Sequence, residues 1–136
     1  MNVYFFSRHT ASQKMIADLG GTITNQFTGT ISNIKRVGNS IEFLELQEKC
    51  VTKHLIDVDS IIVAVAPLPL QIEWLNAGLQ TLLIPQTTRS FDSSGSVVFS
   101  YSGLKRLKSI IIDSEQWSGV APTVEQKHAE RSALAL

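Results

Sequence analysis

The sequence contains little cysteine and little charge, and both shortages exclude classes of protein. Cys50 is the single cysteine among 136 residues, so the chain forms neither an internal disulfide nor a multi-cysteine zinc site. Charged residues make up 18% of the chain, whereas ordinary soluble domains contain roughly 25%. Because so little charge leaves apolar surface to be covered, we expect a homodimer.

Charge of neither sign is in excess. Lys+Arg and Asp+Glu each number 12, so the chain has no formal net charge. Binding of long nucleic acids depends on surplus lysine and arginine that neutralise phosphates, so we expect no long nucleic-acid partner. A compact ligand with a few phosphates needs only a local cluster of basic residues.

Long hydrophobic runs are absent as well. The longest apolar stretch, residues 61–70, contains two prolines, and it falls short of the roughly 20 residues that a membrane helix needs. The first apolar residues, 3–6, are followed at once by Ser7, Arg8 and His9, which is not the pattern of a secretion signal. We therefore expect a cytoplasmic protein with no membrane partner, no metal and no other cofactor.

Two apolar runs predict strands that are buried on both faces of a sheet. Residues 3–6 and 60–66 are rich in β-branched and aromatic side chains and lack polar alternation. Residues 60–84 have the pattern strand, helix, strand, which makes neighbouring strands parallel, and the third strand is expected to end at Pro85. The predicted fold is α/β and Rossmann-like, with a mostly parallel central sheet flanked by helices and a C-terminal β-hairpin addition.

The remaining segments complete the predicted organisation. Residues 1–116 are expected to form a single Rossmann-like domain, and residues 117–136 a tail that is either a short helix or disordered. Residues 22–33 indicate a strand or an extended loop, and residues 41–53 contain either a short strand or the start of a helix. A turn signal at residues 92–96, between apolar runs, predicts the hairpin.

Polar residues follow the first predicted strand and precede the first predicted helix. The segment Ser7-Arg8-His9-Thr10, with Gln13 beyond it, lies past the carboxyl end of that strand, where open α/β sheets bind ligands. Arginine offers a bidentate fork for phosphate, histidine titrates near neutral pH, and hydroxyls add hydrogen-bonding groups. In the alternative interpretation a hydroxyl caps the helix, while Arg8 and His9 point to solvent.

Three later groups would line the same crevice of a parallel sheet. A proline-rich segment after the second strand forms either a rigid apolar wall against a base or only a stiff turn. Hydroxyls around an arginine follow the third strand, and a basic cluster lies near Tyr101; each is typical of a phosphate-binding shell or of a solvated loop. The candidate contacts in these groups are Pro67, Leu68, Pro69, Gln71, Thr88, Arg89, Ser90, Tyr101, Lys105 and Arg106.

Three short motifs resemble a known family. They are the opening Val-Tyr-Phe-Phe-Ser-Arg-His-Thr before a helix, the central Asp-Ser-Ile-Ile-Val-Ala-Val-Ala-Pro-Leu-Pro-Leu-Gln, and the later Ile-Pro with Val-Val-Phe-Ser-Tyr. Over about residues 2–113 the chain resembles the small stand-alone ring nucleases with a CRISPR-associated Rossmann fold (CARF-like) that belong to type III CRISPR systems.

The resemblance implies a function and a mechanism. It implies a homodimer that binds a cyclic oligoadenylate, most often cyclic tetra-adenylate, and cleaves it without metal to switch off the antiviral signal. In the implied reaction a ribose 2′-hydroxyl attacks the neighbouring phosphorus and leaves a 2′,3′-cyclic phosphate. Arg8 would stabilise the phosphate charge, Ser7 would position the ribose, and His9 would act as general acid or base. Arg89 and either Lys105 or Arg106 would bind the other phosphates.

Two other functions remain open. Arg8-His9 also resembles the start of the histidine phosphatases, but Thr10 stands where that family has glycine, and His54 lies in no motif that would supply the second catalytic histidine. The other alternative is a sensor that binds the same cyclic nucleotide without turnover.

Overall fold

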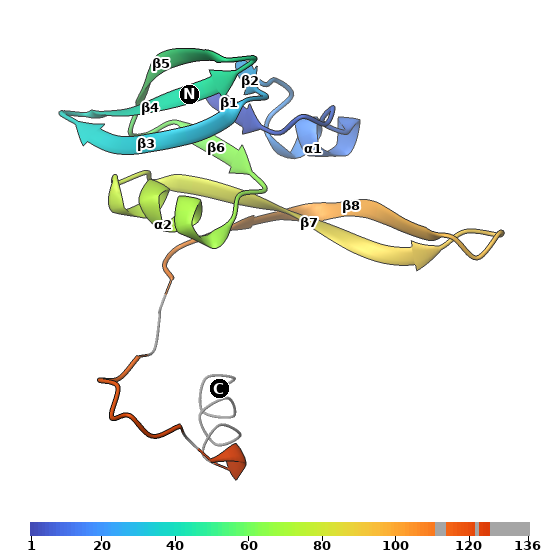
Figure 1. Cartoon of the computed structure of the whole chain (residues 1–136). Helices are drawn as coiled ribbons and strands as arrows, with labels where there is room; N and C mark the ends of the chain where they lie inside the picture. The colour runs from blue at the N-terminus through green and yellow to red at the C-terminus, as the bar shows by residue number, and fades with distance from the viewer. Residues whose placement is uncertain (111–113, 122, 126–136) are drawn as a thin grey trace.

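The computed structural model describes residues 1–110, 114–121 and 123–125, and it contains a five-stranded sheet, a three-stranded sheet and two helices in that part of the chain (Figure 1). The five-stranded sheet has the order β2-β1-β6-β7-β8, and its first four strands are parallel while β8 is antiparallel. Its strands are β1 (Val3–Phe6), β2 (Asn25–Phe27), β6 (Ile61–Ala64), β7 (Thr81–Phe91) and β8 (Val97–Arg106). The other elements are β3 (Thr30–Val37), β4 (Ser40–Gln47), β5 (Cys50–Asp57), α1 (Gln13–Asp18) and α2 (Leu68–Asn76).

Strand β1 is central and is covered on both faces, as its unbroken apolar sequence predicts. Val3 and Phe5 face α1, where they pack with Met15 and with Val63 of β6. The alternate side chains of β1, including Phe6, pack instead against the core beneath α2 and the second sheet. The predicted mostly parallel central sheet is therefore confirmed.

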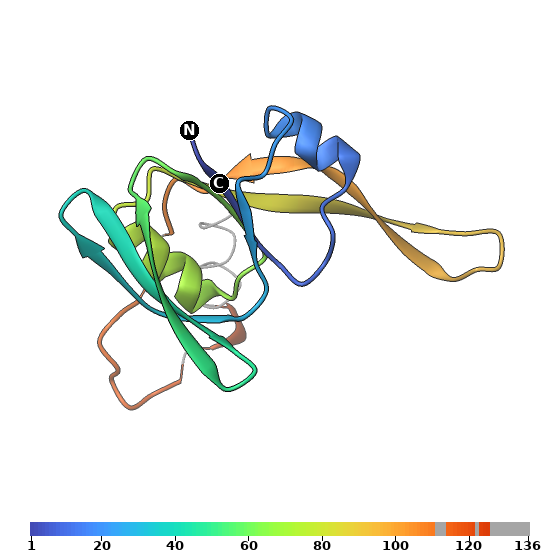
Figure 2. The ribbon, with the colours of Figure 1, turned by 90° about the horizontal axis from the view of Figure 1, so that it is seen from above.

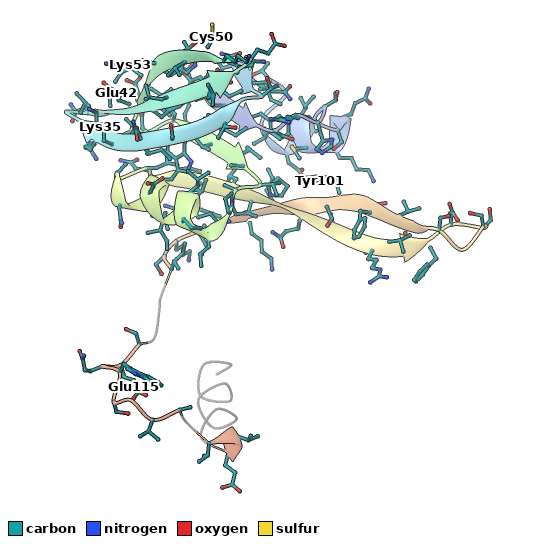
Figure 3. The ribbon with its side chains drawn as sticks, in the orientation of Figure 1. Lys35, Glu42, Cys50, Lys53, Tyr101 and Glu115 are labelled. Carbon is teal, nitrogen blue, oxygen red and sulfur yellow. The ribbon has the colours of Figure 1, made fainter. Side chains whose placement is uncertain are left out.

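The second sheet occupies the connection between β2 and β6, where residues 41–53 were predicted to contain either a short strand or the start of a helix. Strands β3, β4 and β5 form an antiparallel meander that lies over the central sheet beside α2 (Figures 1 and 2). Ile41 and Phe43 of β4 are fully buried against Trp74 of α2 and the central sheet. On the outer face, Glu42 pairs with Lys35 at 3.3 Å and with Lys53 at 3.9 Å (Figure 3). Helices α1 and α2 pack on opposite faces of the central sheet. The described chain therefore has one helix on each face rather than a regular set of flanking helices.

The prediction that the third strand ends at Pro85 is wrong, because β7 continues to Phe91. The amide of Leu107, the residue after β8, donates to the carbonyl of Leu82, so Leu82 and every second residue after it hydrogen-bond toward β8. Pro85 lies between two such positions, and its missing N–H therefore faces away from β8. Strand β6 has already ended there, since its last partner on β7 is Leu83. Proline is tolerated at such an unpaired edge of a strand.

Beyond Pro85 the hairpin projects from the body as an arm, which we define as residues 87–101 (Figures 1 and 2). The predicted turn is confirmed: Asp92 Oδ1 accepts hydrogen bonds from the amides of Ser94 and Ser96. Antiparallel pairing places Phe99 opposite Arg89 and Val97 opposite Phe91, so these four side chains share one face of the arm.

The division into a domain over residues 1–116 and a tail over residues 117–136 stays a prediction, since most of the tail lies outside the described residues. In the part of the chain that the structure covers, no helix has both the length and the apolar character needed to cross a membrane.

Candidate functional site

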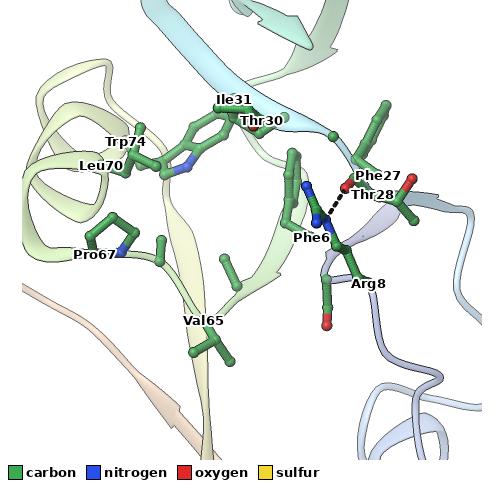
Figure 4. Close-up of a pocket in the computed structure, with 14 residues that line it drawn as sticks. Phe6, Arg8, Phe27, Thr28, Thr30, Ile31, Val65, Pro67, Leu70 and Trp74 are labelled. Carbon is green, nitrogen blue, oxygen red and sulfur yellow. Dashed lines mark hydrogen bonds between the residues drawn. The ribbon is translucent and has the colours of Figure 1, made fainter. Parts of the chain in front are cut away.

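The carboxyl ends of the parallel strands β1, β2 and β6 meet at one edge of the central sheet, and they surround a cavity of about 330 Å³ (Figure 4). The start of β3 and the N-terminal turn of α2 close its sides. The lining residues are Phe6, Ser7, Arg8, Phe27, Thr28, Gly29, Thr30, Ile31, Ala64, Val65, Ala66, Pro67, Leu70 and Trp74. The predicted location of the site, past the ends of the parallel strands, therefore coincides with a hollow in the structure.

The cavity is largely apolar. Trp74 is 1% exposed and forms part of its buried floor, whereas Val65 is 75% exposed at its mouth. Pro67 and Leu70 add to the apolar wall on the α2 side. Arg8 brings the one charged side chain among the lining residues, and none of them is acidic. Such a site fits a ligand that combines an anionic group with a flat or apolar one.

Arg8 is held at the cavity by its Nε atom, which donates a hydrogen bond of 3.2 Å to the carbonyl oxygen of Thr28 (Figure 4). Its two Nη atoms make no hydrogen bond or ion pair with any residue that the structure describes. Arg8 also borders a second hollow of about 330 Å³, lined in addition by Gln47 and Glu48. The guanidinium therefore presents Nη donors at the junction of two hollows.

The loop between β1 and α1 is held by Gln26 of β2 and by the side chain of Ser7. Gln26 Nε2 donates to the carbonyls of Ser7 at 2.7 Å and His9 at 2.8 Å. Ser7 Oγ accepts a 3.0 Å hydrogen bond from the amide of His9. Ser7 and Arg8 both line the cavity, whereas His9 is exposed and lies outside the lining.

Helix α1 begins too far along the loop to reach the cavity. Its cap is Ser12, whose hydroxyl accepts from the amide of Met15 at 3.1 Å. Thr10 and Gln13 are exposed and are not among the lining residues. The helix is therefore capped by Ser12, and not by a hydroxyl of the Ser7-Arg8-His9-Thr10 segment.

The proline-rich segment reaches the cavity in part. Pro67 lines the cavity and precedes the first residue of α2, while Leu68, Pro69 and Gln71 are not among the lining residues. Gln71 Nε2 instead donates to the carbonyl of Ala66 at 2.9 Å, which fixes the end of the strand-to-helix turn. Pro69 has no N–H, so α2 directs few amide donors toward the cavity. The predicted rigid apolar wall fits this geometry better than a helix-terminal anion site does.

The predicted contacts on the hairpin lie away from the cavity. Thr88, Arg89 and Ser90 belong to the exposed arm, because β7 extends through the segment expected to be a loop. The Arg89 guanidinium carbon lies 5.7 Å from the centroid of the Phe91 ring, in a cation–π contact.

The predicted basic cluster on β8 also lies elsewhere. Arg106 donates from Nε and Nη2 to the carbonyl of Gln80, which precedes β7 at the opposite end of the parallel strands, and Lys105 is exposed beside it. Tyr101 Oη donates to Asp18 Oδ2 at 2.5 Å and joins the base of the arm to α1. None of these residues lines the cavity.

Sequence reasoning missed the β2–β3 connection as a wall of the site. Residues 22–33 were predicted only as a strand or an extended loop, yet Thr28 accepts from Arg8 and Gly29 lines both hollows. Only a glycine fits at position 29, since a Cβ atom there would lie 2.5 Å from the carbonyl oxygen of Leu46. The glycine between two threonines was the one feature of the sequence that could have indicated this wall, but it does not reveal that β4 packs against position 29.

The structure shows no group of three or more His, Cys, Asp or Glu side chains that could hold a metal ion among the residues it describes. No family model, no curated protein and no solved structure matches this chain.

Proposed function

We propose that the cavity at Arg8 binds a phosphate-bearing nucleotide, and that the ligand is a cyclic oligoadenylate. The observation that carries the binding proposal is a guanidinium whose two Nη atoms pair with no residue that the structure describes, beside an apolar cavity whose lining contains no acidic residue. The choice of a cyclic oligoadenylate, and of the Rossmann-like CARF relationship, rests on the resemblance of the three sequence motifs.

The two parts of a nucleotide find separate partners in this geometry. A phosphate would accept hydrogen bonds from the Nη atoms of Arg8, the arrangement in which arginine binds phosphate most strongly. An adenine base would lie against Val65, Pro67 and Leu70, whose apolar surface lines the same cavity. These contacts use both the charged and the apolar part of the site.

The volume of the cavity supports one nucleotide per chain rather than a whole ring. Ligand cavities span roughly 300–1,000 Å³, and the cavity at Arg8, at about 330 Å³, is at the lower end of that range. A ring of four adenylates would therefore extend over a second copy of the chain, which suits a two-fold homodimer. The apolar face of the arm, with Phe91 and Phe99 each 66% exposed, is the surface through which we expect this dimer to form.

The proposed reaction is metal-independent cleavage, which switches off type III CRISPR signalling in the cytoplasm. The ribose 2′-oxygen forms a bond to the adjacent phosphorus, the bond from phosphorus to the 5′-oxygen breaks, and the product carries a 2′,3′-cyclic phosphate. The proton leaves the 2′-hydroxyl and another proton reaches the 5′-oxygen. Arg8 would stabilise the charge of the phosphorane, as preorganised donors do in such reactions. Ser7 would position the ribose and His9 would move a proton.

A sensor without turnover is the second candidate, and one observation favours it. The Ser7 hydroxyl already accepts from the His9 amide, and the exposed His9 side chain is not part of the cavity lining. In this geometry Arg8 can bind phosphate, but the general acid or base is not at the binding position.

Incubation of the protein with radiolabelled cyclic tetra-adenylate in EDTA separates these functions. Linear products that end in 2′,3′-cyclic phosphate support the nuclease, and tight binding without products supports the sensor. A parallel incubation with p-nitrophenyl phosphate tests the phosphatase interpretation. Release of phosphate from that substrate, with neither binding nor cleavage of the cyclic ligand, would overturn the proposal.

A further inference from the structure

A carboxylate occupies a core position of β4. Ile41, Phe43 and Glu45 alternate along the strand toward the central sheet, and the first two are fully buried apolar residues. Glu45 is only 8% exposed. Burial of an apolar side chain at this position would cost less free energy, because a buried carboxylate must have its hydrogen bonds supplied by the protein.

Both carboxylate oxygens of Glu45 have a partner. Oε2 accepts a 3.0 Å hydrogen bond from the amide of Gly29, and Oε1 lies 3.0 Å from Nε2 of His54. The His54 ring itself packs against both Phe27 and Phe43, at centroid distances of 4.7 Å and 5.2 Å. His54 therefore holds Glu45 in place, and Glu45 holds the backbone at Gly29.

The bond to Gly29 bears directly on Arg8. The Gly29 N–H and the Thr28 carbonyl belong to one planar peptide group. Glu45 accepts from its N–H, and Arg8 Nε donates to its carbonyl oxygen at 3.2 Å. Rotation of this peptide plane would break both hydrogen bonds at once. The orientation of the guanidinium at the cavity therefore depends on a carboxylate on the opposite side of the peptide.

We propose that Glu45, oriented by His54, is a positioning residue for Arg8: it sets the affinity for the ligand's phosphate without touching the ligand. The inference rests on the proposed function for its ligand, but the link from Glu45 to Arg8 is a property of the protein alone. The pair His54–Glu45 thus belongs to the binding site, although His54 lies in no sequence motif.

The test begins with the free protein. In the wild type the Arg8 Nε–H signal in ¹H–¹⁵N spectra should exchange slowly with water, because it is hydrogen-bonded to Thr28. Glu45→Met should raise that exchange rate about tenfold, whereas Glu45→Gln, which keeps an acceptor for the Gly29 amide, should change it about twofold or less. Glu42→Met is the matched control, because Glu42 lies on the outer face of the same strand and pairs with Lys35 and Lys53. Unchanged exchange in Glu45→Met would overturn the inference.

Titration with cyclic tetra-adenylate then tests the consequence for binding. Glu45→Met should weaken binding about tenfold, and it should have no further effect once Arg8→Ala is present, which is the signature of coupled residues. An equal loss in both backgrounds would mean that Glu45 has only a general structural role. Should Glu45→Met fail to fold, as checked by circular dichroism, His54→Phe replaces it; this variant keeps an aromatic ring against Phe27 and Phe43 but removes the donor to Glu45.

The exchange measurement tests the positioning role, and the titration tests the proposed function, so the two can be rejected independently. Slow Arg8 exchange that depends on Glu45, in a protein that binds no cyclic tetra-adenylate, would reject the proposed function and leave the positioning role intact. Binding that depends on Arg8 but not on Glu45 would reject the positioning role alone.

Discussion

Arg8 Nε and the carbonyl oxygen of Thr28 are joined by a 3.2 Å hydrogen bond that connects the residue two places beyond β1 with the residue next after β2. This contact anchors the guanidinium at one nitrogen and leaves its Nη atoms directed to the cavity side. The two strands are parallel neighbours, and the amide of Ser7 also donates to the carbonyl of Phe27. The position of Arg8 is therefore set by the sheet itself rather than by a long flexible loop.

Replacement of Arg8 gives the first prediction. Arg8→Ala should weaken binding of cyclic tetra-adenylate about tenfold to a hundredfold, because a charged hydrogen-bonding partner of the phosphate is lost. Arg8→Lys should recover only part of the affinity, since lysine lacks the planar fork. Isothermal titration calorimetry measures both. Lys53→Ala is the control, because Lys53 lies on the outer face of the second sheet, where it pairs with Glu42; an equal loss in that variant would mean that the effect reflects overall charge rather than a phosphate bound at Arg8.

Gly29 gives a prediction about stability. Gly29→Ala should lower the free energy of unfolding by about 1–3 kcal/mol, because its Cβ atom would lie 2.5 Å from the Leu46 carbonyl oxygen and 2.7 Å from Glu45 Cγ. Urea denaturation measures the loss. The matched control is Gly38→Ala, at a position where a Cβ atom would meet nothing within 4 Å but where the backbone φ is +62°. A loss at position 29 no larger than that at position 38 would contradict the close packing described for this connection.

The contact between Tyr101 and Asp18 predicts how stability depends on pH. Partial burial and the hydrogen bond to the Asp18 carboxylate raise the pKa of Tyr101 to about 12, from about 10 in an unfolded chain. Because the folded state holds the neutral phenol, this stabilisation is complete below pH 10 and is lost as the pH rises from 10 toward 12. Tyr101→Phe should flatten that part of the profile of unfolding free energy against pH, whereas Tyr4→Phe should leave it in place. In the Tyr4→Phe variant Tyr101 is the only tyrosine, and a phenol that titrates near pH 10 there, by absorbance at 295 nm, would refute the account.

The arm gives a prediction about assembly. Phe91→Ser with Phe99→Ser should convert the expected dimer to a monomer, because both side chains are exposed on one face of the hairpin. Sedimentation velocity measures the change in mass. Thr88→Ala with Ser100→Ala, a cross-strand pair on the other face, should leave the dimer intact. A wild-type protein that is monomeric at all concentrations, or a dimer unaffected by the phenylalanine changes, would show that the arm is not the interface.

The sequence was most informative where one physical requirement governs a segment. The apolar run of β1 has no polar alternation, and the structure buries it on both faces. The turn at residues 92–96 was predictable for a similar reason, because Asp92, Ser94 and Ser96 satisfy one another locally. Local chemistry was sufficient in both cases.

The sequence was least informative where distant partners decide the outcome. Pro85 looked like the end of a strand because its tolerance depends on the point at which β6 stops pairing. Nothing in the sequence around Glu45 indicates that it is buried, since its hydrogen bonds come from His54 on the neighbouring strand and from the approach of Gly29. Ser7, Arg8 and Pro67 line the cavity, whereas Arg89 lies on the arm, and Lys105 and Arg106 lie at the end of β8 away from it.

The most direct test of the central claim is a crystal structure of the protein with cyclic tetra-adenylate, prepared in EDTA. The account predicts a phosphate within hydrogen-bonding distance of Arg8 Nη1 or Nη2 and an adenine against Val65, Pro67 and Leu70. Density for the ligand on the arm or at Lys105, with the cavity at Arg8 empty, would contradict it.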